Sequence, residues 1–109
     1  SDPVFELFGA GAASANGATL TCTVETVVDG ESLILTLRVN SEAPLDVPVT
    51  FLLHPTMSKS VHVVVPRNNS ASVTFYSEGW FHAAAIWDDT VLVLDLRTVP
   101  GIPEWFKRA

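Results

Sequence analysis

The feature that most constrains the fold is an alternation of apolar and polar residues on both sides of one short turn. From Thr19 to Glu25 every second residue is apolar, and the alternation resumes from Ser32 to Asn40 with leucines and a valine at every second position. A period of two places these side chains on one face of a strand. Between the two runs, Asp29-Gly30 suits a type I′ turn, which needs positive φ at both central positions. The pattern predicts a β-hairpin with one buried face.

Further β-rich runs follow at spacings of roughly 8–12 residues, which is typical of sandwiches and not of helix-rich folds. Gly9–Gly17 is a run of small residues and is expected to be a loop. The expected strands are Val4–Phe8, Thr19–Glu25, Ser32–Asn40, Val49–Leu53, Ser60–Val65, Ser72–Ser77, Trp80–Trp87 and Thr90–Asp95. The sequence therefore predicts an all-β fold, an immunoglobulin-like β-sandwich of about eight antiparallel strands.

The length of 109 residues suits a single domain over 1–109, and we expect it to be an excerpt from a longer protein. Residues 98–109 are rich in proline and leave two alternatives open. They are either a linker or a tail that packs Trp105 or Phe106 against the sandwich.

Charge and cysteine content indicate which classes of partner and which cellular location to expect. The net charge is −6, with 12 acidic residues against 6 lysines and arginines, so the surface repels nucleic acid and anionic lipid. A basic peptide would be attracted instead. Cys22 is the one cysteine, which excludes an internal disulfide and favours a cytoplasmic location. No apolar run approaches the roughly 20 residues of a membrane span. We expect no nucleic-acid or membrane partner.

The common catalytic and metal motifs are not present in the sequence. It has no glycine-rich phosphate loop, no HExxH pair and no Gly-x-Ser-x-Gly elbow. The three histidines are at positions 54, 62 and 82, without a pattern that indicates zinc. A hydrolase using His54, Ser58 and the acidic pair Asp88-Asp89 is a remote alternative. The expectation is a protein that is not an enzyme and needs no cofactor or metal.

Two stretches are the best candidates for a binding site, because each adjoins the end of an expected strand. They are Phe51–Met57 and Tyr76–Phe81, and strand-end loops of a sandwich can meet at one end of the molecule. Phe51 and Phe81 also fit a role in the core. The candidate ligand-binding residues are His54, Thr56, Met57, Gly79, Trp80 and Phe81.

These stretches resemble the YEATS domain, in particular its prokaryotic type. The shared elements are Leu53-His54-Pro55-Thr56, Gly79-Trp80-Phe81, the strand Leu92–Leu96 and Pro103-Glu104-Trp105-Phe106. The resemblance covers residues 47–107.

The resemblance implies an immunoglobulin-like fold and a reader of acylated lysine, whose flat amide lies between aromatic rings. It implies that His54 and Thr56 are the polar members of the site and that Trp80 and Phe81 are the aromatic ones. Met57 replaces an aromatic residue of the family pattern, and adjacent Trp80 and Phe81 would point to opposite faces of a strand. Prokaryotic members are sensor or adaptor modules in multidomain proteins of bacterial defence and signalling.

Two functional hypotheses follow. In the first, the domain binds a peptide or protein, with an acylated lysine as the specific ligand, at the loop end. In the second, it is a scaffold that contacts another protein through a sheet face or an edge strand. The sequence leaves the oligomeric state open.

Overall fold

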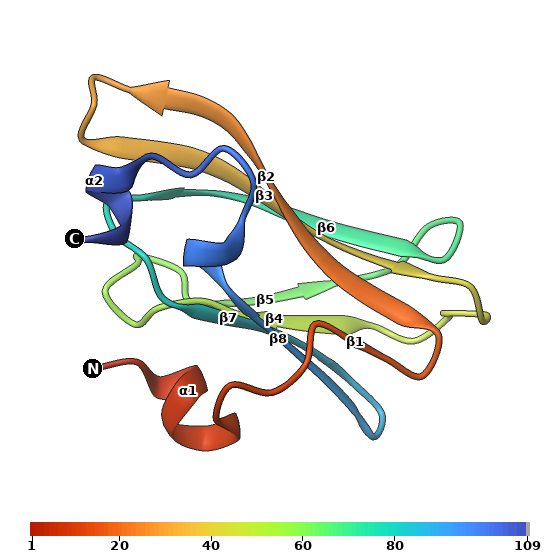
Figure 1. Cartoon of the computed structure of the whole chain (residues 1–109). Helices are drawn as coiled ribbons and strands as arrows, with labels where there is room; N and C mark the ends of the chain where they lie inside the picture. The colour runs from red at the N-terminus through yellow and green to blue at the C-terminus, as the bar shows by residue number, and fades with distance from the viewer. Residues whose placement is uncertain (109) are drawn as a thin grey trace.

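A computed structural model describes residues 1–108 and consists of two packed antiparallel sheets (Figure 1). The first sheet has the order β1-β2-β3-β6 and the second has the order β5-β4-β7-β8. The strands are β1 (Ser14–Ala15), β2 (Ala18–Val28), β3 (Ser32–Ser41), β4 (Val49–Leu52), β5 (Val61–Val64), β6 (Ser70–Ser77), β7 (His82–Trp87) and β8 (Thr90–Asp95). Three short helical segments accompany them: α1 (Pro3–Phe8), η1 (Leu96–Thr98) and α2 (Glu104–Lys107).

The strand connections are those of an immunoglobulin-like sandwich. In immunoglobulin lettering, β2, β3 and β6 take the places of strands A, B and E, and β5-β4-β7-β8 takes the order C′-C-F-G. The prediction of an all-β sandwich of about eight antiparallel strands is confirmed. Strands β5 and β6 are the edge strands of their two sheets and lie on the same side of the sandwich.

The β2–β3 hairpin has the predicted turn and the predicted buried face. Asp29 and Gly30 have φ of 51° and 67°, and the Glu31 N–H donates to the Val28 carbonyl at 3.1 Å. Strand β3 buries its leucines and valine completely, and these side chains form the centre of the core. The inward residues of the hairpin are Leu20, Cys22, Leu33, Leu35, Leu37 and Val39.

The prediction of a strand at Val4–Phe8 is wrong, because the segment is the helix α1. Pro3 lies at its first turn, where the missing N–H costs nothing and the fixed φ suits a helix. The Glu6 N–H donates to the Asp2 carbonyl at 3.0 Å and closes the first turn. The predicted loop Gly9–Gly17 is irregular apart from β1, so the eighth strand is this two-residue segment.

Over residues 98–108 the C-terminal segment packs against the sandwich and is not a free linker. Val99, Ile102 and Phe106 are buried in the same core cluster as the strands, and Phe106 is fully inaccessible. Trp105 lies beside Phe106 with their ring centroids 5.9 Å apart. Ala109 lies outside the described residues. Within residues 1–108, no helix combines the length and the apolar content that a membrane crossing requires.

Candidate functional site

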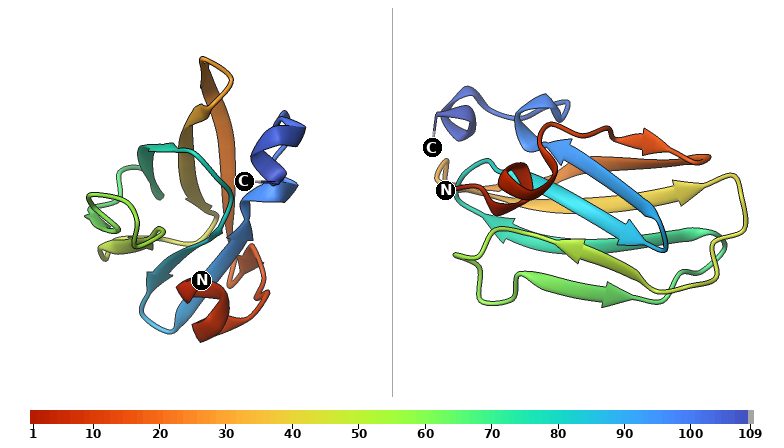
Figure 2. Two further views of the ribbon diagram at one scale, coloured as in Figure 1. Left: turned by 90° about the vertical axis from the view of Figure 1, so that its left-hand side faces the viewer. Right: turned by 90° about the horizontal axis from the view of Figure 1, so that it is seen from below.

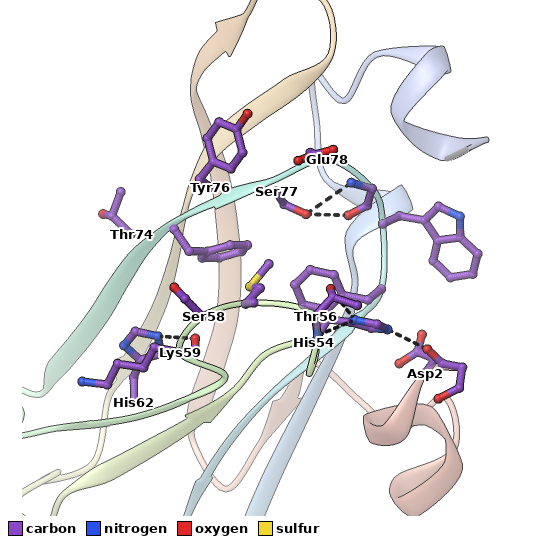
Figure 3. Close-up of a pocket in the computed structure, with 16 residues that line it drawn as sticks. Asp2, His54, Thr56, Ser58, Lys59, His62, Thr74, Tyr76, Ser77 and Glu78 are labelled. Atoms are coloured by element: carbon purple, nitrogen blue, oxygen red, sulfur yellow. Dashed lines mark hydrogen bonds between the residues drawn. The ribbon is translucent and has the colours of Figure 1, made fainter.

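A single end of the sandwich carries an open groove of about 920 Å³ (Figure 3). One side comes from the β4–β5 loop around His54, and the other comes from the end of β6 and the β6–β7 loop. His62 of edge strand β5 also lines the groove. All six candidate residues from the sequence line it: His54, Thr56, Met57, Gly79, Trp80 and Phe81. The predicted approach of the two loops is therefore a property of this fold.

His54 is held by hydrogen bonds from both sides of its ring. The Thr56 N–H donates to Nδ1 at 3.2 Å, so Nδ1 is an acceptor and the Thr56 hydroxyl at 2.8 Å is a second donor to it. Nε2 then carries the proton and donates to the Ser1 carbonyl at 2.6 Å. The ring is thus a fixed part of the groove wall. The Thr56 oxygen keeps lone pairs that can accept a hydrogen bond from a ligand.

The base of the groove is apolar and aromatic. Phe81 is buried and lies near both Phe75 and His54, with ring centroids 6.0 and 5.8 Å away. Met57 is partly buried and packs against the same core. Phe81 is thus a core residue, as the alternation of apolar and polar residues in the sequence favoured. It also lines the groove. Phe75 is the residue that the sequence analysis missed, although it is the last inward aromatic of β6 before the loop.

Trp80 does not form an aromatic pair with Phe81. Its ring is stacked against the Arg97 guanidinium, with Cζ 3.7 Å from the ring centroid, and it also meets the edge of His82. Strand β7 begins at His82, not at Trp80 as predicted, so these two aromatics belong to the loop. Trp80 is half-buried and is one of the residues that line the groove.

A charged network behind Trp80 ties the N-terminal segment to the second sheet. The buried His82 ring donates from Nδ1 to Asp2 Oδ2 at 2.8 Å, and the same oxygen accepts the His82 backbone N–H at 3.0 Å. On its other side His82 Nε2 lies 3.7 Å from Asp95 Oδ2. Asp95 in turn binds Arg97 through both carboxylate oxygens. This chain of contacts fixes the cation that holds Trp80.

The pKa of Asp95 is lowered by this environment. Burial of the carboxyl raises the pKa, but hydrogen bonds from the Arg97 side chain and backbone N–H, and the charge of Arg97, outweigh it. Because the folded-state pKa lies below the unfolded one, the stabilisation is complete above the unfolded pKa near 3.8. It is lost as the pH falls through the folded-state pKa.

Replacing Asp95 with asparagine is therefore expected to destabilise the fold in a pH-dependent way. At pH 7 we expect Asp95→Asn to lower the free energy of unfolding by about 1–2 kcal/mol, since it removes charge-assisted hydrogen bonds. At pH 2, below the unfolded-state pKa near 3.8, the difference from the wild type should be smaller. Urea denaturation at both pH values measures it, with Asp89→Asn at the exposed β7–β8 turn as the control. An unchanged difference at both pH values would contradict the role of the carboxylate charge.

The arrangement that motivated the hydrolase alternative is not assembled. Both His54 nitrogens are engaged by Thr56 and Ser1, and Asp88 lies in the β7–β8 turn, at the opposite end of β7 from the groove (Figure 1). Ser58 lines the groove without a hydrogen bond to His54 among the described residues. His62 contacts the Lys59 carbonyl, and across residues 1–108 no three His, Cys, Asp or Glu side chains converge on a metal position.

The cysteine offers no reactive thiolate. Cys22 is buried in the core, and burial together with the nearby Glu25 charge raises its pKa to about 12. A thiol at neutral pH with such a pKa is neither a nucleophile nor a metal ligand. Its role is to fill the inner face of β2.

The groove is the part of the molecule with the strongest claim to function, since it combines an aromatic base, fixed polar groups and an open mouth. Most of its lining comes from the β4–β5 and β6–β7 loops, which strands β5 and β6 separate in the sequence. Comparison of the chain with protein-family models, with curated proteins and with solved structures finds no match.

Proposed function

We propose that this domain is a non-catalytic recognition module that binds a peptide in the groove at the loop end of the sandwich. The observation that carries the proposal is the convergence of His54, Thr56, Met57 and Phe81 on one open groove of about 920 Å³. A pocket of this size with an apolar base and a few oriented polar groups is the usual form of a specific ligand site. By resemblance to prokaryotic YEATS domains, the module would serve as a cytoplasmic sensor or adaptor in a multidomain protein.

The ligand that suits the groove best is a basic peptide carrying an acylated lysine. The acidic chain attracts a basic peptide, while an acylated lysine side chain is neutral and can be buried without the cost of a buried ammonium. In this arrangement the acyl group packs on Phe75, Phe81 and Met57, because methionine can adapt to a slot that lacks a third ring. Thr56 and His54 stand beside it as the polar groups.

The stacking partner differs from the one that the resemblance implies. Since one face of Trp80 is already covered by Arg97, Trp80 serves as a rim and not as half of an aromatic sandwich. We therefore assign the primary aromatic contact to Phe75 and Phe81, which lie 6.0 Å apart at the base. This assignment predicts a preference for acyl chains longer than acetyl, which reach the base of the groove.

Titration with paired peptides tests the proposal. A lysine-rich peptide is prepared unmodified, acetylated and crotonylated, and binding is followed by intrinsic tryptophan fluorescence and by calorimetry. We expect the acylated forms to bind more tightly than the unmodified form. Thr56→Val should weaken their binding roughly fivefold, because one hydrogen bond is worth about 1 kcal/mol. The matched control is Thr21→Val on the exposed face of β2. No binding of any acylated peptide at millimolar concentration would reject this ligand.

A further inference from the structure

Strand β6 has one edge that no other strand within residues 1–108 covers. It pairs with β3 along its other edge, and the open edge has only the bridge between Arg67 and Ser70 at its beginning. The strand is eight residues long, and its register with β3 is continuous from Ser70 to Ser77. Proteins usually block a free edge with charged residues, prolines or bulges, and Ser70–Ser77 contains none of these.

The hydrogen bonds around β6 show which of its backbone groups face the open edge. The Ser41 N–H donates to the Asn69 carbonyl at 3.0 Å, one step beyond the end of the β3–β6 register. Because hydrogen-bonded pairs recur at every second residue of an antiparallel ladder, the odd-numbered residues of β6 face β3. Ser70 agrees with this phase, since its N–H and C=O both bond to Arg67 on the open side, at 3.1 and 2.8 Å. The remaining residues whose backbone groups face the open edge are Ser72, Thr74 and Tyr76.

The groove lies directly beside this edge. Thr74 and Tyr76 of β6 line one border of the groove, and His62 of β5 lines the other (Figure 3). Strands β5 and β6 follow the same side of the sandwich, which faces away from α2 (Figure 2). Between the two open-edge residues, the buried Phe75 side chain points to the interior near Phe81. Free backbone donors and acceptors therefore lie next to an aromatic pocket.

An extended peptide has the chemistry to use both features at once. A strand added to the open edge would extend the first sheet, and its side chains would alternate between the outer face and the groove. The peptide residue opposite Phe75 would direct its side chain into the groove, while its two neighbours would lie opposite Thr74 and Tyr76. A second copy of β6 cannot do the same, because its own inward side chains, such as Val73 and Phe75, are buried in its own core.

We propose that the peptide binds by strand addition, antiparallel to β6, with its acylated lysine opposite Phe75. This inference rests on the proposed function, since it uses the same groove, and it adds how the peptide backbone is held. Antiparallel addition continues the pairing of all strands in both sheets. The residues flanking the lysine then exchange hydrogen bonds with Thr74 and Tyr76, while the lysine N–H points away from β6. Both flanking residues need a free N–H, which excludes proline there.

N-methylation of the peptide backbone tests this register. Three forms of the crotonylated peptide each carry one N-methyl group, on the residue before the lysine, on the lysine or on the residue after it. Calorimetry should show a dissociation constant raised about tenfold or more by methylation of either flanking residue, because a hydrogen bond is lost and a methyl group meets β6. Methylation of the lysine nitrogen is the matched control and should raise it by less than about threefold.

The outcomes separate this inference from the proposed function. If the parent peptide binds and the three methylated forms bind equally well or are weakened equally, strand addition is wrong and the groove remains the binding site. If the parent peptide does not bind at millimolar concentration, both proposals fail.

Hydrogen exchange of the protein amides locates the added strand. In the free domain the Thr74 and Tyr76 amides should exchange faster than the Phe75 amide, which faces β3. Saturation with the crotonylated peptide should slow the exchange of Thr74 and Tyr76 at least tenfold. Slowing at Val61 and Val63 instead would place the peptide on β5 and overturn the proposal. Protection of Thr74 and Tyr76 that rises with protein concentration without peptide would identify a second copy as the occupant and would also overturn it.

Discussion

Replacing Phe106 with alanine is expected to lower the free energy of unfolding by about 3–5 kcal/mol, the usual cost of removing a fully buried phenylalanine. Phe106 belongs to α2 near the C-terminal end, yet its side chain is inaccessible and lies in the cluster that holds the leucines of β3. The substitution would leave a cavity that the surrounding strands cannot close. Such a loss is a large share of the stability of a domain of this size.

Urea denaturation of Phe106→Ala measures this effect. Lys107→Ala is the matched control on the same helix, because Lys107 makes only a surface ion pair with Glu104 at 3.2 Å. We expect the control to change the free energy of unfolding by no more than about 0.5 kcal/mol. If Phe106→Ala cost no more than the control, the tail would be a linker and not part of the core.

Gly11→Ala is expected to destabilise the fold by about 2–4 kcal/mol, from two additive causes. Gly11 has a φ of +56°, which is costly for any residue with a Cβ. An added Cβ would also lie 2.7 Å from Val93 Cγ2 and 2.8 Å from Val93 Cβ. Val93 is part of β8 and its N–H binds the Ala12 carbonyl at 2.9 Å, so neither side can move freely.

The close approach of an added Cβ to Val93 distinguishes Gly11 from the other turn glycines. Gly30 has a similar φ of +67° in the hairpin turn, with nothing within 4 Å of an added Cβ. We expect Gly30→Ala to cost only the conformational part, about 1–2 kcal/mol. Thermal unfolding of both variants gives the comparison. Equal losses at the two positions would show that the close approach to Val93 does not contribute.

The sheets were predictable because their inner faces follow strict alternation, and the turn at Asp29-Gly30 has one favourable conformation. The helix α1 was not predicted, because Val4–Phe8 is apolar enough to resemble a strand. The informative signal was Asp2-Pro3, which begins a helix. The start of β7 was also predicted two residues early. In both cases a local apolar run was given more weight than the residues that precede it.

The groove could be predicted as a meeting of two loops but not in its details. Strand order brings His54 and Gly79 together, and strand order follows from the fold class. The direction of Trp80 depends on Arg97, and the burial of His82 depends on Asp2, eighty residues away. Long-range polar partners of this kind leave no periodic trace in a single sequence.

The site itself is tested most directly by locating a bound acylated peptide with ¹⁵N-edited NMR. On titration with a crotonylated lysine peptide, we predict shifts of the amide resonances of His54, Thr56, Met57 and residues 78–81, while those of Thr21 and Arg38 on the first sheet stay unchanged. Shifts confined to the outer face of the β5-β4-β7-β8 sheet, or no shifts at millimolar peptide, would contradict it.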